Sequence, residues 1–278
     1  MSVLLLCEDT ALSQALNAQL ASRGRQLTHC TPAELLADVG LADGAILVNA
    51  SLMPGQPFTE ELAALQRRLL VELGPQLRSY IVLSDPRVLA ALGDDSPLSE
   101  NATPAPQDED GKRLAAMEEV LLASPVQSVV LRSGPLIATA GDNILSAFIR
   151  ALKAGEAVGL NHGAHSCPTP VSDLARVLSA MIDQLYCGAT CRGIYHYQSS
   201  GSTSAYAFAE VAYAHSSQYL AGAPDIAIDE QGWDWQPHVQ VLRCERLLRN
   251  FGIKQLPWRA WLPKMIKTLC EDDYDERV

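Results

Sequence analysis

The sequence has no long apolar stretch. None of its 278 residues fall in a run near the roughly 18 apolar residues that a membrane-spanning helix needs. The start, Met1 to Leu6, has no basic segment ahead of an apolar one, as a secretion signal would. We therefore expect no membrane partner, the N-terminus of a mature protein, and a cytoplasmic location.

Basic residues are also few. There are 21 Lys and Arg against 32 Asp and Glu, which gives a formal net charge of −11. A negative surface disfavours nucleic acid and anionic membranes, because both carry the same sign of charge. Since 48% of the residues are hydrophobic, the chain can build a substantial core, as one large domain or two unequal ones.

Paired metal ligands are missing. The seven cysteines are scattered and odd in number, which predicts reduced and mostly buried thiols. Cys187 and Cys191 lie close together, but no second pair of Cys or His follows at a zinc-like spacing. His162 and His165 lie in a loop without acids, which favours solvent exposure over metal binding. No metal site is expected.

Glycine is absent from the turn after the first apolar run. Val3–Leu6 reads as a buried strand and Ala11–Arg23 as an amphipathic helix, the start of a Rossmann-like unit. In a dinucleotide site, glycines let the backbone approach the pyrophosphate at the positive end of this helix. The residues found in that turn are Glu8, Asp9, Thr10, Ala11 and Ser13.

These turn residues suit a helix cap better than a cofactor. Asp9 or Thr10 can cap the helix, and carboxylates are favourable at its positive end. The same carboxylates fill the anion site with the protein's own charge, so NAD(P) is possible but disfavoured and no cofactor is expected. Weak adenosine-type binding near His29 and Cys30, after the second strand, stays open.

Strand-like and helix-like runs alternate through the first half. This alternation predicts an α/β fold: a Rossmann-like, doubly wound parallel sheet with helices on both faces. The expected strands are Val3–Leu6, Gln26–Cys30, Ala45–Asn49, Ser79–Ser84 and Ser128–Arg132, and the expected helices are Ala11–Arg23, Glu60–Leu73 and Gly111–Ala123.

The second half predicts a smaller, mixed C-terminal lobe. We expect residues 1–140 to form the Rossmann-like NAD(P)-binding-type domain and 141–278 the substrate-type lobe, with part of 141–240 returning to the first domain. The acidic tail, Glu271–Val278, is either a solvated end or a docking segment. The expected elements are helices at Gly141–Ala154, Pro170–Leu185 and Ser204–His215, and a strand at Tyr195–Tyr197.

Several short motifs, in order, resemble one known family. The chain is similar to the extended short-chain dehydrogenase/reductase superfamily, specifically the dTDP-4-dehydrorhamnose reductase-like (RmlD-like) sugar-nucleotide proteins. This resemblance covers nearly the whole chain and implies a Rossmann fold with a substrate lobe. The motifs are Ser99–Pro106, Val129–Leu136, Cys167–Ala175, Gly193–His196, Ala207–Ala209, Val241–Leu247, Phe251–Ile253 and Trp258.

The catalytic pair of that family is not present. Members carry a Tyr and a Lys four residues apart on one helical face, where the ammonium lowers the pKa of the phenol. The matching residues are Asp110 and Leu114, and no tyrosine lies between Tyr80 and Tyr186. An exposed carboxyl group with a pKa near ~4 is a poor proton donor at neutral pH, so Asp110 does not replace the tyrosine.

The residues that match the substrate side are closer to the family pattern. Ser84 stands where the family has Ser or Thr, and either hydrogen-bonds a substrate carbonyl or bonds nearby backbone. Asp173 is either a ligand contact or a first-turn helix acid, and Arg132 either a ligand contact or an internal ion-pair partner. The full substrate-type set is Ser84, Arg132, Asn143, Thr169 and Asp173.

Trp233 and Trp235 form the most concentrated aromatic spot. Tryptophan is enriched in protein interfaces, so the two side chains either contact a partner or cover the core of the small lobe.

The missing catalytic set favours a binding function. The resemblance implies a non-catalytic (pseudoenzyme) protein, a regulatory subunit that contacts another protein or itself, since such family members are known. The alternative is an NAD(P)-dependent reductase or epimerase acting on a nucleotide sugar, with Ser84 and an atypical acid or base. A third hypothesis is a sensor that keeps a cleft for a nucleotide-sugar-like small molecule without turnover.

Overall fold

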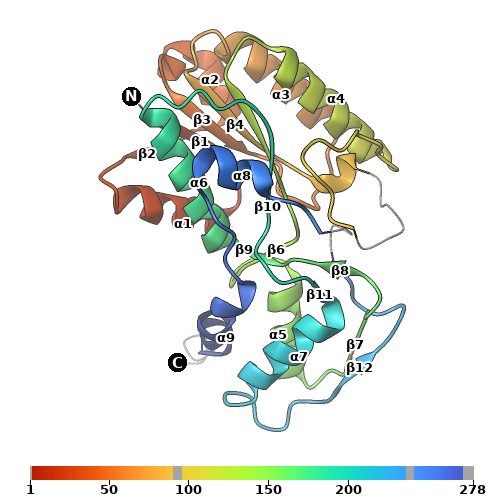
Figure 1. Ribbon diagram of the computed structural model, residues 1–278. Helices are drawn as coiled ribbons and strands as arrows, with labels where there is room; N and C mark the ends of the chain where they lie inside the picture. Colours follow the sequence, from red (N-terminus) through yellow and green to blue (C-terminus); the bar gives the residue numbers. More distant parts are fainter. Residues whose placement is uncertain (1, 90–95, 236–240, 272–278) are drawn as a thin grey trace.

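The computed structural model describes residues 2–89, 96–235 and 241–271. It has a large lobe, built on one six-stranded parallel sheet, and a smaller helical lobe below it (Figure 1). Of the acidic tail, only Glu271 is described, at the end of a helix. The predictions for residues 272–278 lie outside the described residues.

The sheet confirms the predicted α/β class. Its strand order is β10-β5-β4-β3-β1-β2, and every neighbouring pair is parallel. Parallel order with right-handed crossovers requires helices between the strands, as the alternating sequence predicted. The strands are β1 (Val3–Cys7), β2 (Leu27–His29), β3 (Ile46–Ala50), β4 (Ser79–Ser84), β5 (Ser128–Ser133) and β10 (Gly193–Tyr197).

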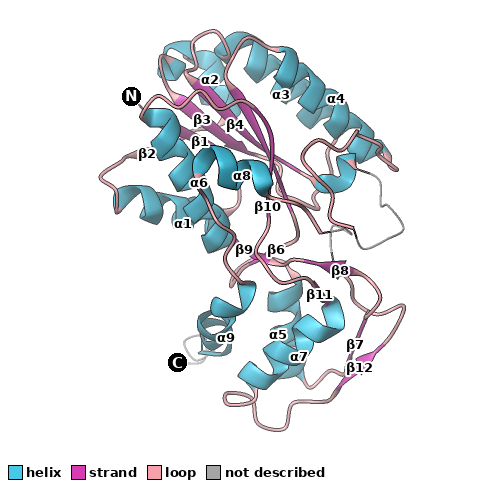
Figure 2. Ribbon diagram, viewed as in Figure 1, coloured by secondary structure: helices cyan, strands magenta, loops and turns pink. Residues whose placement is uncertain are grey.

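Helices cover both faces of the sheet (Figure 2). Successive side chains of a strand point to opposite faces, so each central strand is buried twice. Leu5 and Val48 pack on one face with α1 (Thr10–Ala21), α6 (Val171–Tyr186) and α8 (Glu245–Phe251). Leu4 and Leu47 pack on the other with α2 (Pro32–Ala37), α3 (Glu60–Leu73) and α4 (Glu109–Ala123).

The small lobe has a core of its own. Apolar side chains of three helices meet Trp235 and Trp258 there, both fully buried. The helices are α5 (Ile144–Ala154), α7 (Ala205–Ser216) and α9 (Leu262–Glu271). The short strands are β6 (Leu136–Ile137), β7 (Val158–Leu160), β8 (His165–Ser166), β9 (Thr169–Pro170), β11 (Thr203–Ser204) and β12 (Ile226–Ile228), and the 3₁₀ turns are Val39–Ala42, Pro86–Val88 and Trp258–Ala260.

The chain passes between the lobes repeatedly. After β5 it enters the small lobe, returns for α6 and β10, leaves again for α7 and β12, returns for α8, and ends in α9. Residues beyond 140 are therefore divided between the two lobes. No described helix is long and apolar enough to cross a membrane.

Side-chain caps set the helix starts. Helix α1 begins at Thr10 because the Asp9 carboxylate accepts the Leu12 N–H, as the sequence predicted. Helix α5 begins at Ile144, three residues later than predicted, because Asn143 caps it in a reciprocal box with Ser146.

Candidate functional site

The turn after β1 is closed by its own side chains. Asp9 Oδ1 lies 2.7 Å from the Leu12 nitrogen, and the Ser13 hydroxyl donates to the Thr10 carbonyl at 3.1 Å. Burial raises the pKa of the Cys7 thiol to about 11, so it stays neutral as it donates to the Asp9 carbonyl. Glu8 and Thr10 are exposed, and Ala11 packs partly against the core.

These residues do not fit a dinucleotide. The positive end of α1, where a pyrophosphate would bind, already holds the Asp9 carboxylate. A phosphate placed there would displace an established cap and meet a second carboxylate at Glu8. After β2, the side chain of Thr31 caps α2 with Glu34, and His29 is exposed. The side chains of these two turns therefore differ from the glycine-rich backbone that a dinucleotide site uses.

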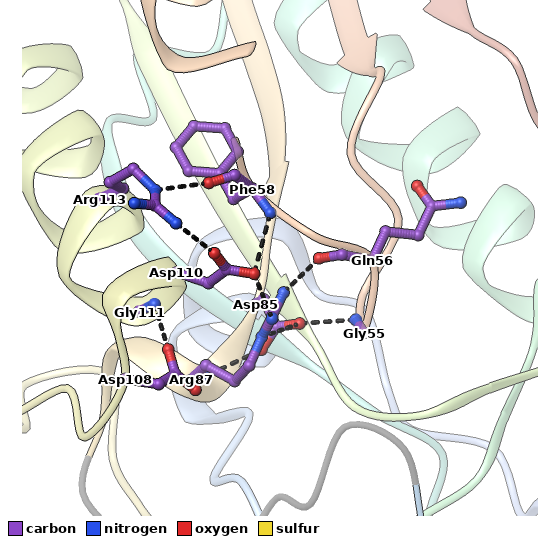
Figure 3. A network of polar contacts seen from close by, with 9 residues as sticks. All are labelled: Gly55, Gln56, Phe58, Asp85, Arg87, Asp108, Asp110, Gly111 and Arg113. Atoms are coloured by element: carbon purple, nitrogen blue, oxygen red, sulfur yellow. Dashed lines mark hydrogen bonds and ion pairs between the residues drawn. The ribbon is translucent and has the colours of Figure 1, made fainter. Parts of the chain in front are cut away.

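Asp110, which the resemblance in sequence matched to the family tyrosine, belongs to a closed network (Figure 3). Its carboxylate accepts from Arg113 Nη2 at 2.6 Å, from the Phe58 N–H at 3.1 Å and from Arg87 Nη1 at 3.2 Å. Arg113 also donates to the Phe58 carbonyl at 2.7 Å. The negative charge of Asp110 is thus shared between two guanidinium groups and one backbone amide.

A second carboxylate completes this network. Asp85, fully buried, accepts from the Gly55 N–H at 2.7 Å and from the backbone N–H of Arg87 at 2.8 Å. Arg87 Nε lies 3.1 Å from Asp85, and its Nη2 donates to the Gln56 carbonyl at 2.6 Å. We call Asp85, Arg87, Asp110 and Arg113, with the backbone of 55–58, the Asp110 network.

The environment moves the pKa of the two carboxyl groups in opposite directions. Burial raises the pKa of Asp110, but the hydrogen bonds from Arg113 and Phe58 and the two guanidinium charges outweigh it and hold the pKa below its usual value. For Asp85, burial outweighs Arg87 and its backbone donors, so the pKa is raised. Asp110 is therefore ionised at neutral pH. It accepts hydrogen bonds and is not suited to donate a proton.

Leu114, which the resemblance in sequence matched to the family lysine, lies in the core. Leu114 is 3% exposed and packs among the apolar side chains between α3, α4 and the sheet. Gly111, one turn earlier, lets α4 approach the Pro86–Val88 turn, because a Cβ there would lie 2.5 Å from the Arg87 carbonyl oxygen. The face of α4 that carries Gly111 and Leu114 is thus packed against the rest of the chain.

Ser84 and Arg132 belong to a buried polar chain. The Ser84 hydroxyl donates to Glu118 Oε1 at 2.6 Å, and Arg132 forms two hydrogen bonds to the same carboxylate at 3.0 and 2.5 Å. Arg132 Nη1 lies 3.4 Å from His196 Nε2. Burial, and then the Arg132 charge, lower the pKa of His196 to about 3, so the imidazole is neutral. The sequence left Arg132 open as a ligand contact or an internal ion-pair partner. In the structure it is paired with Glu118.

The other predicted cleft residues also have protein partners. Asp173, fully buried, accepts from Tyr197 at 2.5 Å, from Arg176 at 2.7 Å and from Ser199 at 3.1 Å. Thr169 is buried, and its hydroxyl oxygen accepts the Ser199 N–H at 3.0 Å. These side chains tie α6 to the end of β10.

A cavity of about 680 Å³ lies between the lobes, and we call it the cleft. It brings together Asp9, Asn143, Trp233 and Trp235, whereas Ser84, Arg132, Thr169 and Asp173 are not among its lining residues. Asn143 has no spare polar group there, because its oxygen caps α5 and its amide donates to the Ala138 carbonyl at 3.1 Å.

The two tryptophans have different roles. Trp235 is fully buried, donates from Nε1 to the Thr203 carbonyl at 3.0 Å and packs edge-on to Phe208. The prediction that Trp235 contacts a partner is therefore corrected: it belongs to the core of the small lobe. Trp233 is 39% exposed and lines the cleft.

Two parts of the site were missed from the sequence. Residues 53–56 form one wall of the cleft. Arg87 connects this loop to α4, because it contacts both the Gln56 carbonyl and Asp110. The charge pattern of the sequence could have indicated the role of Arg87. Asp85 and Arg87 directly follow a buried strand, and Asp110 and Arg113 open a helix. Among the residues with described positions, no group of three or more His, Cys, Asp or Glu could hold a metal ion.

Comparison with known proteins identifies the family. A model described as "RmlD substrate binding domain" matches residues 81–271, more than half of the chain, so the chain belongs to this family. A curated relative, dTDP-4-dehydrorhamnose reductase of Aggregatibacter actinomycetemcomitans, is 26% identical over 168 residues. That match covers 58% of this chain and only 57% of the relative.

Solved structures show the same fold over the whole length. A dTDP-4-dehydrorhamnose reductase of Clostridium acetobutylicum superposes with a TM-score of 0.79 at 19% identity, covering 97% of this chain and 99% of that one. The enzyme of Bacillus anthracis, solved in complex with NADP, gives 0.78 at 18% identity, covering 96% and 98%. The likeness to these structures shows that the chain has their fold.

Proposed function

We propose that this chain is a non-catalytic member of the RmlD family, a binding or regulatory protein that keeps the cleft without reductase chemistry. The Asp110 network carries this proposal. At the position of the family tyrosine, a carboxylate with a lowered pKa is held by two arginines and a backbone amide. Such a group neither donates a proton at neutral pH nor turns toward a substrate without breaking these bonds.

Two further positions support it independently. Leu114 stands in the core where the family has a lysine, and Asp9 occupies the helix end where a dinucleotide phosphate would bind. Each position has a full structural role, so the three replacements agree with one another. A regulatory subunit needs a stable fold and a binding surface. It does not need a catalytic tyrosine, a catalytic lysine or a phosphate-binding turn.

One observation favours a second candidate. The curated relative is named a dTDP-4-dehydrorhamnose reductase, and the Bacillus anthracis structure contains NADP. Under this candidate the chain is an NAD(P)-dependent oxidoreductase acting on a nucleotide sugar, with an acid other than tyrosine. Asp110 is the residue on which that chemistry would depend, since it occupies the position of the family tyrosine.

A direct assay separates the two. The purified chain is incubated with NADPH or NADH and dTDP-4-dehydrorhamnose, and cofactor oxidation is followed beside an active reductase of the family. We expect no turnover above background, and no thermal stabilisation by either cofactor. Turnover by the wild type that is lost in Asp110→Asn, a matched neutral variant, would refute the proposal and establish the second candidate.

A further inference from the structure

A groove separate from the cleft lies where β10 ends beside α8, and we call it the α8 groove (Figure 1). Its volume is about 570 Å³, and none of its described lining residues also lines the cleft. Its floor is apolar, because Cys167, Leu242 and Ile253 line it and are buried. Leu248 of α8 lines it too and is 47% exposed. The groove therefore offers apolar surface to a partner.

Hydrogen bonds fix both walls of the α8 groove. On one side, the Leu98 N–H donates to the Val241 carbonyl at 2.8 Å, and the Leu98 carbonyl accepts the Arg243 N–H at 2.8 Å. On the other side, the side-chain amide of Gln255 donates to the Gln198 carbonyl at 2.8 Å. Because these walls are already held in place, a ligand would not lose affinity by ordering them.

The charge of this part of the chain is opposite to that of the rest. Residues 241–271 hold seven Lys and Arg against two Asp and Glu, whereas the remaining residues hold 14 against 30. The whole chain has a formal net charge of −11, so the positive segment stands out from its surroundings. A concentration of one sign of charge attracts a partner of the opposite sign.

Three of these cations surround the α8 groove. Arg243 and Lys254 line it. Arg259 lies against Gly201, another lining residue, because a Cβ there would be 3.4 Å from Arg259 Nη1. Glu245 is the one acid among the described lining residues, and it lies 3.7 Å from Arg243. Within the described part of the chain, Lys254 and Arg259 form no ion pair, so both can pair with an acidic partner.

We propose that the α8 groove is the docking site for an acidic peptide segment of a partner protein, with a large apolar residue between its acids. The apolar residue lies against Leu248, and the neighbouring carboxylates pair with Lys254 and Arg259. The apolar floor favours such a peptide over a simple polyanion, which would use the cations alone. This inference rests on the proposed binding function, for which it names a surface and the chemistry of the partner.

Three synthetic peptides test the proposal by isothermal titration. The first has three repeats of Glu-Asp-Leu with blocked ends, the second has Ser for each Leu, and the third has Lys for each acid. At low ionic strength we expect the first to bind about tenfold more tightly than the second, and the third not to bind. The affinity of the first should fall about tenfold in about 0.5 M salt, because the exposed charges are screened.

Two double variants with the same change of charge locate the binding. Arg243→Gln with Lys254→Gln should weaken the binding of the first peptide about tenfold, because two cations of the groove are lost. Lys264→Gln with Lys267→Gln removes the same charge from exposed positions of α9, outside the groove, and should change the affinity less than about twofold.

A second pair of variants tests the apolar contact. Leu248→Ser should weaken the binding about fivefold, because less apolar surface is buried. Val71→Ser, at a valine of α3 that is exposed elsewhere on the surface, is the matched control and should bind like the wild type. Urea unfolding of each variant checks that it is folded.

Any of three results would overturn this inference. The first peptide does not bind, the Arg243→Gln and Lys254→Gln double variant binds it like the wild type, or a simple polyanion binds as tightly. The polyanions tested are the serine-containing peptide, oligothymidylate and vesicles that contain phosphatidylserine. None of these results changes the outcome of the NADPH oxidation assay. A failure of the docking surface is therefore distinguishable from a failure of the non-catalytic function.

Discussion

At the scale of single residues, three positions singled out in the sequence have structural roles. Asp9 caps a helix, Asp110 fixes a loop, and Leu114 fills the core. The sequence predicted that Asp9 or Thr10 caps this helix, because capping depends on residues only three positions away, and the cap is Asp9. It could not predict the partners of Asp110, since Phe58 lies 52 residues and Arg87 23 residues away in the chain.

The core position of Leu114 gives a test at this scale. Leu114→Lys should lower the free energy of unfolding by about 3 kcal/mol or more, because a cation would be buried without a partner. Leu114→Met, which keeps the volume apolar, should cost less than about 1.5 kcal/mol. Urea unfolding at pH 7 measures both. Equal stability of the two variants would mean that this helix face is open to solvent.

At the scale of elements, β10 depends on a polar chain that no local pattern reveals. Ser84, Glu118, Arg132 and His196 come from β4, α4, β5 and β10, and they meet only because the sheet places these elements side by side. The boundaries of α3 and β4 agreed with the sequence to the residue, because caps and apolar periodicity define them. Helices α2 and α8 were missed, since six or seven residues carry too little periodicity.

The neutral His196 predicts an acid sensitivity of the sheet. Its folded pKa of about 3 lies below the ~6.5 of an unfolded histidine, so the unfolded chain takes up the proton first as the pH falls. The contribution of His196 to the free energy of unfolding is fully present above pH ~6.5 and is lost progressively below it. At pH 5 the loss from this residue is about 2 kcal/mol.

His196→Gln keeps an acceptor for Arg132 but does not titrate, so it isolates this effect. Urea unfolding of wild type and variant at pH 7 and pH 5 should show a smaller loss in the variant. A pH dependence that is the same in both proteins would contradict the assignment. His29→Gln, a substitution of an exposed histidine, serves as the control.

At the scale of the whole molecule, the two lobes share the cleft but have separate cores. The sequence predicted the parallel sheet and a second lobe, because both follow from alternation and length. The division of residues beyond 140 was predictable only in part, since the return of α6, β10 and α8 to the sheet depends on which apolar faces meet. The wall of the cleft is still harder to predict, because loops from both lobes form it.

Trp233 and Trp235 are expected to contribute differently to stability. Trp235→Ala should destabilise the protein by about 3–5 kcal/mol, because it leaves a large cavity beside Phe208 and an unpaired Thr203 carbonyl. Trp233→Ala should cost about 1 kcal/mol, since its side chain is partly exposed. Chemical denaturation of both variants provides the comparison. A similar loss in the two would show that Trp233 belongs to the small-lobe core.

The repeated passage of the chain between the lobes has a consequence for modularity. No single cut in the gene separates a Rossmann module from a ligand module, because each lobe is assembled from several separate stretches. A fragment of residues 141–278 would carry α6, β10 and α8 with their apolar faces exposed. The cleft therefore cannot be transplanted as one continuous segment.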